Sequence, residues 1–381
     1  MFRLAHISDI HLGLETVPSI RELASKRITG YVNWHRKRRK AMFGEVLERL
    51  LDDIQTKKPD HLAITGDLVN LATDDEVEAA HLWLTGVGDD LTTSVVPGNH
   101  DAYVPGAFDK VAKAWRNYMI GDDVRRTIHP DDQFPYMRVR GKVALIGLST
   151  ATATPPFVAS GYYDIPQARR TVELLEEARE RGLFRVIMIH HPPVRRAAIW
   201  HKRMVGIGRF AKVLQQAGCE LVLHGHTHLN TIHWLPSPGG LVPVVGIASA
   251  SQGPGGKKPT ATYNLFSIDG KPGAWSCRLE RFQLHHPLGE PAKRISDDDL
   301  TKPETVPPGH VDPRLGQDEL PGLLSVIRPA AAPVSLEERE VRETLEVEPS
   351  ASAGKPVRKR GKQRQPADDA ADEKPDEARQ E

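Results

Sequence analysis

The chain has 381 residues, a formal net charge of +1 and two cysteines. Cys219 and Cys277 are far apart and neither lies in a CxxC pair, so we interpret both as ordinary thiols of a reducing compartment. This excludes a disulfide framework and a cysteine-rich structural zinc site. No segment approaches the roughly 20 apolar residues that a membrane-spanning helix needs.

Five short apolar, β-branched runs are predicted to form buried strands. In chain order they cover residues 2–7, 61–65, 94–96, 185–189 and 220–223. Longer segments with helical signals lie between these runs, at residues 39–55, 74–86, 108–118, 166–181 and 208–217. The alternation of strands and helices predicts a layered α/β domain.

A polar segment rich in metal-binding side chains follows each predicted strand. These segments are Asp9-Ile10-His11, Gly66-Asp67, Gly98-Asn99-His100-Asp101, His190-His191 and the HGHTH of residues 224–228. Open α/β sheets place their sites just beyond the carboxyl ends of their strands, so we expect these side chains to meet. Carboxylate, imidazole and amide ligands suit Mn²⁺, Fe and Zn²⁺. The series therefore predicts a two-metal hydrolytic site.

The motifs DxH, GD, GNHD, a histidine directly after a strand, and GHxH occur here in the order typical of one family. The chain resembles the calcineurin-like metallophosphoesterases from Phe2 to about His228. The resemblance implies a sandwich of two central mixed sheets flanked by helices. It also implies two divalent or mixed-valence metal ions, Mn, Fe or Zn, as cofactors.

The resemblance assigns a role to each matching residue. It implies one metal held by Asp9, His11, Asp67 and His228, and a second held by Asp67, Asn99, His190 and His226. Asp67 would bridge the two ions, and a hydroxide between them would attack phosphorus in line. His100 would stabilise the transition state or protonate the leaving alkoxide, and Asp101 would orient neighbouring groups. His190 is preferred to His191 as the ligand, and His224 is interpreted as a supporting or core histidine.

Differences between branches of the family narrow the expected substrate. Serine/threonine phosphatases of the family carry GDxVDRG and GNHE, whereas this chain has GDLVNL at residues 66–71 and GNHD at residues 98–101. The opening HISDIHLG and the segment VPGNHD resemble the bacterial cyclic-nucleotide phosphodiesterase-like branch. We therefore predict a phosphodiesterase with a cyclic nucleotide as the leading substrate. The alternatives are a nuclease of the Mre11 and SbcD kind, a UDP-diacylglucosamine-type pyrophosphatase, and a non-enzymatic scaffold with a degenerate phosphoesterase domain.

Residues 25–40 form a basic stretch with seven Lys and Arg residues and no acidic residue, interleaved with Tyr31, Trp34 and His35. Because it follows the first predicted ligand strand, we expect it near the site as a cap or insertion. Such a stretch could bind an anionic membrane surface, a nucleic acid or a polyphosphate substrate. A solvated helix face is the alternative. The sequence predicts no stable protein partner.

The composition changes near residue 287. We predict a catalytic domain at residues 1–287 and a disordered low-complexity tail at residues 288–381, where Pro, Ala and charged residues dominate and no strand pattern is visible. Met1 runs directly into the first strand without a signal-peptide pattern, which predicts a cytoplasmic protein. Peripheral attachment at the inner face of the membrane through residues 25–40 stays open.

Overall fold

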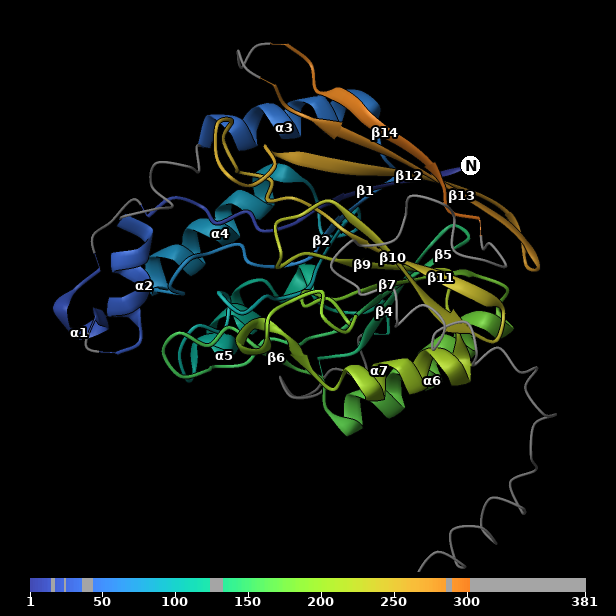
Figure 1. Cartoon of the computed structure of the whole chain (residues 1–381), viewed down its shortest axis with the longest axis horizontal. Helices are drawn as coiled ribbons and strands as arrows, with labels where there is room; N and C mark the ends of the chain where they lie inside the picture. Colours follow the sequence, from blue (N-terminus) through green and yellow to red (C-terminus); the bar gives the residue numbers. More distant parts are fainter. Residues whose placement is uncertain (15–17, 24, 36–43, 124–132, 286–289, 302–381) are drawn as a thin grey trace, which may run out of the picture. The chain divides into compact units, whose positions relative to one another are not determined.

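The computed structural model describes residues 1–14, 18–23, 25–35, 44–123, 133–285 and 290–301. This part of the chain contains two six-stranded sheets (Figure 1). The first has the order β14 (Lys293–Asp299), β13 (Ala274–Gln283), β12 (Thr262–Lys271), β1 (Phe2–Ile7), β2 (His61–Ile64) and β3 (Thr93–Val95). The second has the order β10 (Thr231–Ser237), β11 (Gly240–Gly246), β9 (Leu221–His224), β7 (Phe184–Met188), β5 (Val143–Gly147) and β4 (Tyr136–Arg140).

Both sheets are mixed, with parallel strands at their centres. In the first sheet β1, β2 and β3 are parallel, and β12, β13 and β14 are antiparallel to their neighbours. In the second sheet β5, β7, β9 and β11 are parallel. Parallel strands end at the same edge of a sheet, so the loops that follow them gather there. The predicted α/β class with two central mixed sheets is confirmed.

The two sheets share one apolar core. Along β7, Phe184, Val186 and Met188 join the cluster that contains the β1 residue Leu4, whereas Ile187 joins a second cluster. This alternation is the period of two expected of a strand buried on both faces. The second cluster also contains residues of α6 (Ile165–Glu180) and α7 (Ile207–Ala217), which cover the outer face of the second sheet. The helix α3 (Gly44–Lys57) packs near β12 of the first sheet.

A capping box fixes the loop that leaves β2. The helix α4 (Asp74–Val87) begins after Thr73, whose side chain accepts a hydrogen bond from Glu76 N while the Glu76 carboxylate accepts one from Thr73 N. The same carboxylate accepts hydrogen bonds from the backbone N–H groups of Asn70 and Leu71, at 2.9 and 3.0 Å. The helix terminus therefore holds the backbone of the segment that carries Asp67.

One predicted helix is divided in the structure, and the basic stretch contains a helix of its own. The segment 108–118 is split into α5 (Ala107–Ala114) and a 3₁₀ turn at Arg116–Tyr118. The basic stretch contains α2 (Arg27–Asn33), which follows the short α1 (Ile20–Leu23). None of the helices in the described ranges has both the length and the apolar composition required to cross a bilayer.

The first sheet continues beyond residue 287, where the catalytic domain was predicted to end, as far as β14. This edge strand reads KRISDDD and has no apolar pattern, so composition alone gave no signal of it. Ion pairs across and along the strand hold it: Arg278 Nε lies 2.5 Å from Asp297 Oδ1, and Arg294 Nη1 lies 2.9 Å from Asp297 Oδ2. Leu300, directly after the strand, is buried. Residues 302–381, with their predicted disorder, lie outside the described residues.

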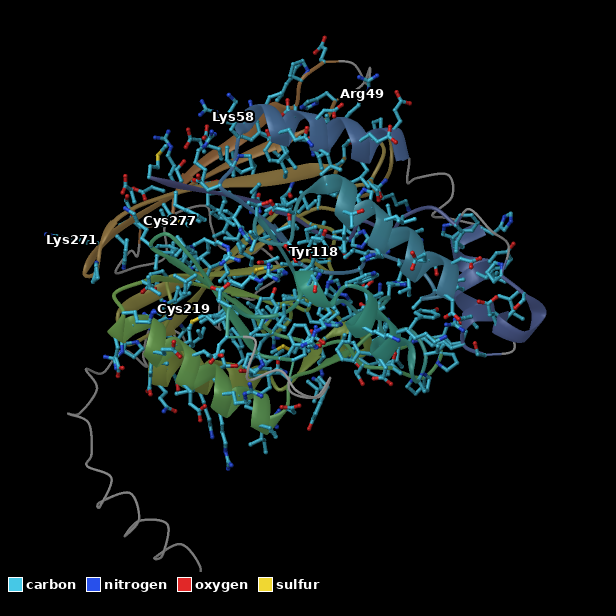
Figure 2. All side chains as sticks on the ribbon, turned by 180° about the vertical axis from the view of Figure 1, so that it is seen from behind. Arg49, Lys58, Tyr118, Cys219, Lys271 and Cys277 are labelled. Atoms are coloured by element: carbon cyan, nitrogen blue, oxygen red, sulfur yellow. The ribbon has the colours of Figure 1, made fainter. Side chains whose placement is uncertain are left out.

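Both cysteines are buried free thiols, as predicted. Cys277 lies on β13 of the first sheet, and Cys219 lies just before β9 of the second (Figure 2). Burial raises the pKa of the Cys277 thiol, so the thiol is held in its neutral, unreactive form at ordinary pH.

Candidate metal centre

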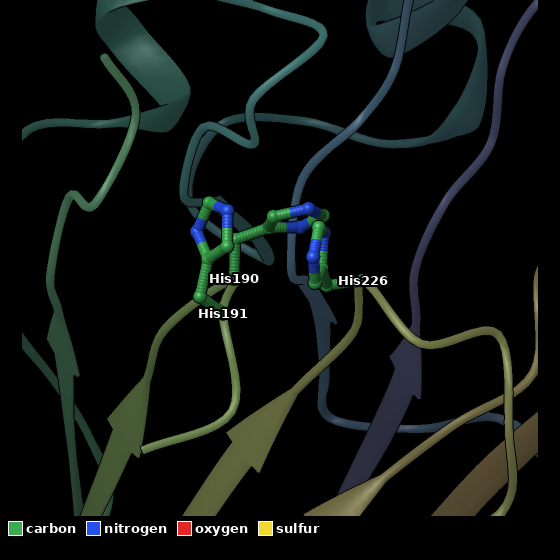
Figure 3. Close-up of side chains that lie close together, drawn as sticks. All are labelled: His190, His191 and His226. Carbon is green, nitrogen blue, oxygen red and sulfur yellow. The ribbon is translucent and has the colours of Figure 1, made fainter. Parts of the chain in front are cut away.

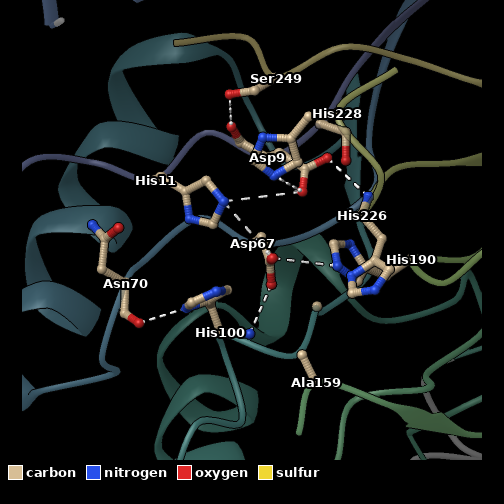
Figure 4. A network of polar contacts seen from close by, with 12 residues as sticks. Asp9, His11, Asp67, Asn70, His100, Ala159, His190, His226, His228 and Ser249 are labelled. Carbon is tan, nitrogen blue, oxygen red and sulfur yellow. Dashed lines mark hydrogen bonds and ion pairs between the residues drawn. The ribbon is translucent and has the colours of Figure 1, made fainter. Parts of the chain in front are cut away.

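The loops after β1, β2, β3, β7 and β9 bring the predicted ligands together (Figure 4). In each of several groups the potential ligand atoms all lie within 4.8 Å of one another. Three of these groups contain Asp9 or Asp67. They are Asp9, His11 and His228; Asp9, Asp67 and His190; and His11, Asp67 and His100. Side chains separated by more than 200 positions in the sequence thus converge at the carboxyl ends of the strands.

Asp67 lies between the two predicted sets of ligands. Its Oδ2 is 3.3 Å from His190 Nε2 and 3.8 Å from His11 Nε2. Its Oδ1 accepts a 2.7 Å hydrogen bond from the backbone N–H of His100. The side chain is buried, so both oxygens face protein groups rather than solvent. A carboxylate in this position has one histidine of each predicted set within reach.

Three of the predicted histidine ligands are oriented by backbone carbonyl groups. The pairs are His11 Nδ1 with Val69 O at 3.1 Å, His190 Nδ1 with Thr65 O at 2.6 Å, and His226 Nε2 with Lys202 O at 2.8 Å. A carbonyl oxygen accepts a hydrogen bond from the ring nitrogen that it contacts, so that nitrogen carries the proton and the tautomer is selected. The nitrogen available for a cation is therefore Nε2 in His11 and His190, and Nδ1 in His226.

Buried polar atoms without hydrogen bonds test whether these residues fit metal ions. Asn99 Oδ1 is buried and has no hydrogen-bond partner among the described residues. Asp9 Oδ1 and His190 Nε2 also make no hydrogen bond there, although they lie 3.1 Å from His228 Nε2 and 3.3 Å from Asp67 Oδ2. Leaving such atoms unsatisfied costs about 1–3 kcal/mol each. A cation satisfies amide oxygen, carboxylate and imidazole together, so the donor set fits the metals predicted.

The backbone at the centre adopts an uncommon conformation. In the described residues, nine non-glycine residues have positive φ, and five of these are predicted ligands: Asp9, His11, Asp67, His226 and His228. Such conformations cost energy and persist where the surrounding structure enforces them, often at functional sites. The concentration of strain agrees with a site built to hold side chains in one arrangement.

Two glycines allow the loops after β2 and β3 to approach each other closely. Gly66 has a φ of +92°, a value that favours glycine, and a Cβ there would lie 2.6 Å from Gly98 N. A Cβ on Gly98 would overlap the Asp67 carboxylate. Any larger residue at either position would push the loop after β2 away from the loop after β3.

His100 is held beside Asp67 by three contacts. Its backbone bonds Asp67 Oδ1, its Nδ1 lies 2.6 Å from Asn70 O, and its ring stacks on Tyr103 with centroids 5.4 Å apart and an angle of 13°. Because the carbonyl of Asn70 accepts a hydrogen bond from Nδ1–H, Nε2 is the nitrogen through which the ring would exchange a proton with a ligand. The GNHD motif predicted His100 beside the metal ligands, whereas no sequence pattern indicated that Tyr103 would stack on its ring.

Asp101 joins the loops after β2 and β3. Its carboxylate accepts backbone hydrogen bonds from Asp67 at 2.8 Å, Leu68 at 2.9 Å, Val69 at 3.3 Å and Gly98 at 2.8 Å. Burial and the nearby charge of Asp67 together raise the pKa of Asp101 to about 7, although the backbone donors oppose the rise. These hydrogen bonds to the backbone of two ligand loops are the contacts that the predicted orienting role requires.

His190, His191 and His226 form a further group of potential ligands (Figure 3). Both ring nitrogens of His191 have protein partners, since Nδ1 lies 2.7 Å from Thr150 Oγ1 and Nε2 lies 3.2 Å from Ala159 O. His190 has one nitrogen bonded to a carbonyl and the other directed to Asp67. This geometry favours His190 over His191 as the ligand. His224 is buried, with Nδ1 3.0 Å from Gly225 O, outside the groups of potential ligands.

The described cations of the basic stretch anchor α2 to the rim of the centre. Lys26 Nζ contacts Thr154 Oγ1 at 2.8 Å and Val158 O at 3.0 Å, and lies 4.6 Å from the centroid of the Tyr103 ring. The Arg27 guanidinium donates to the carbonyl of Leu71 at 3.0 Å. The stretch therefore lies near the site, as expected. The basic residues at 36–40 lie outside the described residues.

Comparison with known proteins agrees with this geometry. A family model described as calcineurin-like phosphoesterase matches residues 2–230. A dimetal phosphatase from Danio rerio is similar in structure, with a TM-score of 0.51 and 13% identity over 79% of this chain and 99% of that chain. A purple acid phosphatase from yellow lupin seeds has a TM-score of 0.48 and 10% identity over 74% of this chain and 51% of its own. At 13% identity the likeness to the Danio rerio phosphatase shows the fold alone. None of the curated protein sequences compared matches this chain.

Proposed function

Because this chain belongs to the calcineurin-like phosphoesterase family, we propose that it is a two-metal phosphodiesterase with a cyclic nucleotide as its leading substrate. Family membership implies metal-dependent hydrolysis of a phosphoester. The observation that carries the proposal is the position of Asp67, with His11 Nε2 at 3.8 Å and His190 Nε2 at 3.3 Å from the same carboxylate oxygen. One carboxylate shared by two ligand sets is the arrangement that a dinuclear centre requires.

The ligands of the two cations come from five loops. We assign one cation to Asp9, His11, Asp67 and His228, and the other to Asp67, Asn99, His190 and His226. When bound, Mn, Fe or Zn ions in such a centre acidify a shared water and withdraw charge from a phosphate. The carbonyl groups of Val69, Thr65 and Lys202 hold the imidazoles in the required orientation.

His100 is assigned as the general acid. The carbonyl of Asn70 holds the proton on Nδ1, so Nε2 is the atom that donates a proton to the leaving alkoxide. The stack on Tyr103 fixes the plane of the ring, and the bond from His100 N to Asp67 ties it to the metal ligands. A positioned acid of this kind contributes roughly 10²- to 10⁴-fold to the rate.

The preference for diesters is supported by sequence motifs. Residues 98–101 read GNHD, and Asn70 stands where protein phosphatases of the family carry the Asp of GDxVDRG. Both features argue against a protein phosphatase and agree with the cyclic-nucleotide phosphodiesterase-like branch that the sequence resembles.

An assay with a panel of substrates tests this proposal. Purified full chain with Mn²⁺ is given bis-p-nitrophenyl phosphate, p-nitrophenyl phosphate, cyclic AMP, single-stranded DNA and UDP-diacylglucosamine, with Asp67→Ala as the metal-site control. We expect hydrolysis of the diesters, with cyclic AMP turned over, and loss of hydrolysis in the variant. Preference for the monoester contradicts the diesterase assignment, DNA cleavage supports a nuclease, and cleavage of the lipid-linked pyrophosphate alone supports the pyrophosphatase. Absence of any turnover supports a scaffold.

A further inference from the structure

Bulky apolar side chains are exposed on a short ribbon beside the metal centre. This ribbon pairs β6 (Gly161–Tyr162) with β8 (Met204–Val205). In the segments leading into it, Phe157 is 83% exposed, Ile199 59% and Trp200 74%. Single exposed apolar side chains are ordinary, whereas a contiguous group of them marks an interaction site.

Backbone pairing brings these three side chains to one end of the ribbon. The two strands run in parallel, and the pairing continues before them, where Ala159 N donates a 2.8 Å hydrogen bond to His201 O. Phe157 lies two residues before the first of this pair, and Ile199 and Trp200 lie directly before the second. We call Phe157, Ile199 and Trp200 the ribbon tip. Phe157 also has a φ of +65°, an unfavourable value for an aromatic residue.

The ribbon tip borders the metal centre. The carbonyl of Lys202 lies 2.8 Å from His226 Nε2, and the carbonyl of Ala159 lies 3.2 Å from His191 Nε2. Each of the two segments that carry the ribbon tip thus contacts a histidine of the centre. A surface that contacts the tip is brought to the rim of the metal site.

The surroundings of the ribbon tip are basic. Residues 190–219 contain six Lys and Arg residues and no Asp or Glu, and residues 150–163 contain no charged residue. Arg195, Arg196, Lys202 and Arg203 are all exposed. The apolar tip therefore projects from a region that attracts anions.

A hollow next to the ribbon offers a place for an anionic group. Arg195, Arg196 and Arg203 line it together with residues 204–207. The helix α7 begins at Ile207, so its N-terminal backbone N–H groups lie at the same place. Three guanidinium groups and the positive end of an eleven-residue helix suit the phosphate of a lipid headgroup.

We propose that the ribbon tip docks on the surface of an anionic phospholipid bilayer. Phe157 and Trp200 insert at the level of the headgroups with the aliphatic Ile199, and the surrounding cations contact anionic lipids. A single-stranded nucleic acid stacks on aromatic rings but gains little from an exposed isoleucine. Docking brings the metal centre to phosphoesters in the headgroup layer, a substrate class that rests on the hydrolytic function proposed above.

The test measures binding of the full chain to vesicles, without turnover. Sedimentation with phosphatidylcholine vesicles is compared with sedimentation with vesicles that also contain phosphatidylglycerol. We expect binding to the anionic vesicles and a loss of at least about tenfold in the Phe157→Ser/Trp200→Ser double variant. The matched control is Leu82→Ser/Leu91→Ser, which changes two side chains of similar exposure, 62% and 66%, outside the ribbon. Trp200→Phe is expected to keep most of the binding.

A second pair of variants tests the charge. We expect Arg195→Gln/Arg196→Gln to weaken binding to anionic vesicles. The control Arg179→Gln/Lys271→Gln, which changes exposed residues of α6 and of the end of β12, is expected to leave it unchanged. Thermal unfolding verifies that each variant is folded. The proposal is overturned if the wild-type chain ignores anionic vesicles, binds neutral vesicles equally well, or loses no more binding in the ribbon variants than in the controls. The proposal is also overturned if the wild-type chain binds a single-stranded oligonucleotide and the ribbon variants lose that binding while they still bind anionic vesicles. A chain that binds vesicles but hydrolyses no ester contradicts only the proposed function.

Discussion

The Asp101 carboxylate accepts a 2.8 Å hydrogen bond from the backbone N–H of Asp67, the residue assigned to both metal ions. It accepts further hydrogen bonds from Leu68, Val69 and Gly98. The loops after β2 and β3 are thus joined through one fully buried side chain. A positioning role of this kind predicts effects on metal affinity and on folding together.

Asp101→Asn is expected to weaken both properties. The amide nitrogen of the new side chain faces backbone N–H groups, which are donors themselves. Because one charged acceptor is lost, some of these buried N–H groups have no acceptor, and the free energy of unfolding falls by about 2–4 kcal/mol. Altered support of metal ligands typically lowers metal affinity by roughly 10- to 100-fold. Urea unfolding and metal titration measure the two effects. Asp164→Asn, at the N-cap of α6, is the matched control, and an equal loss of metal affinity in both variants contradicts the positioning role.

Removal of Asp67 should differ from removal of Asn99 in metal stoichiometry. Asp67 is assigned to both cations, so Asp67→Ala is expected to weaken binding of two ions. Asn99 is assigned to one, so Asn99→Ala is expected to retain about one tightly bound ion per chain. Metal analysis after dialysis against a limiting chelator measures the ratio. Identical stoichiometry in the two variants would show that Asp67 is not shared.

His100→Asn is expected to lower kcat by about 10²- to 10⁴-fold while metal content stays at the wild-type value. The asparagine cannot supply the proton that we assign to Nε2. Substrates with good leaving groups need little protonation, so the loss should be smaller for a p-nitrophenyl ester than for an alkyl ester. Equal losses for the two esters contradict the assignment as general acid.

The strand ends could be predicted because local sequence specifies them. A buried parallel strand is an apolar run, and the ligands follow it directly, so Asp9, Asp67 and His190 were placed by pattern alone. The groups that orient these ligands left no such trace. The carbonyls of Thr65 and Lys202 belong to the main chain, which any residue supplies, and β6 and β8 have two residues each, too few for a periodic pattern. The ribbon and the ribbon tip depend on pairing between segments that are far apart in the sequence, so the sequence pattern could not predict them.

Metal binding should strengthen as the pH rises toward 9. Burial lowers the pKa of His190, but the nearby charges of Asp67 and Asp9 and the contact with the carbonyl of Thr65 outweigh burial and raise the pKa to about 9. In the metal-free chain the proton therefore stabilises the fold fully below pH 6.5, the usual value, and this contribution disappears as the pH passes about 9. A cation must displace the proton. Calorimetry in two buffers of different ionisation enthalpy is expected to show that metal binding releases a proton at pH 7. If the number of protons released is not smaller at pH 9.5, the proton does not come from a His190 with a pKa of about 9.

Two truncations separate the first sheet from the residues that follow it. Removal of residues 302–381 is expected to leave hydrolysis and the free energy of unfolding unchanged, because β14 and Leu300 remain. Removal of residues 288–381 also deletes β14, uncovers the edge of β13 and exposes the site of Leu300, which should lower the free energy of unfolding by about 2–4 kcal/mol. Urea unfolding of both truncated chains, with hydrolysis of bis-p-nitrophenyl phosphate at low temperature, measures the difference. Equal stability of the two would show that the ion pairs of Asp297 and the burial of Leu300 contribute nothing to the fold, and would restore the domain boundary at residue 287.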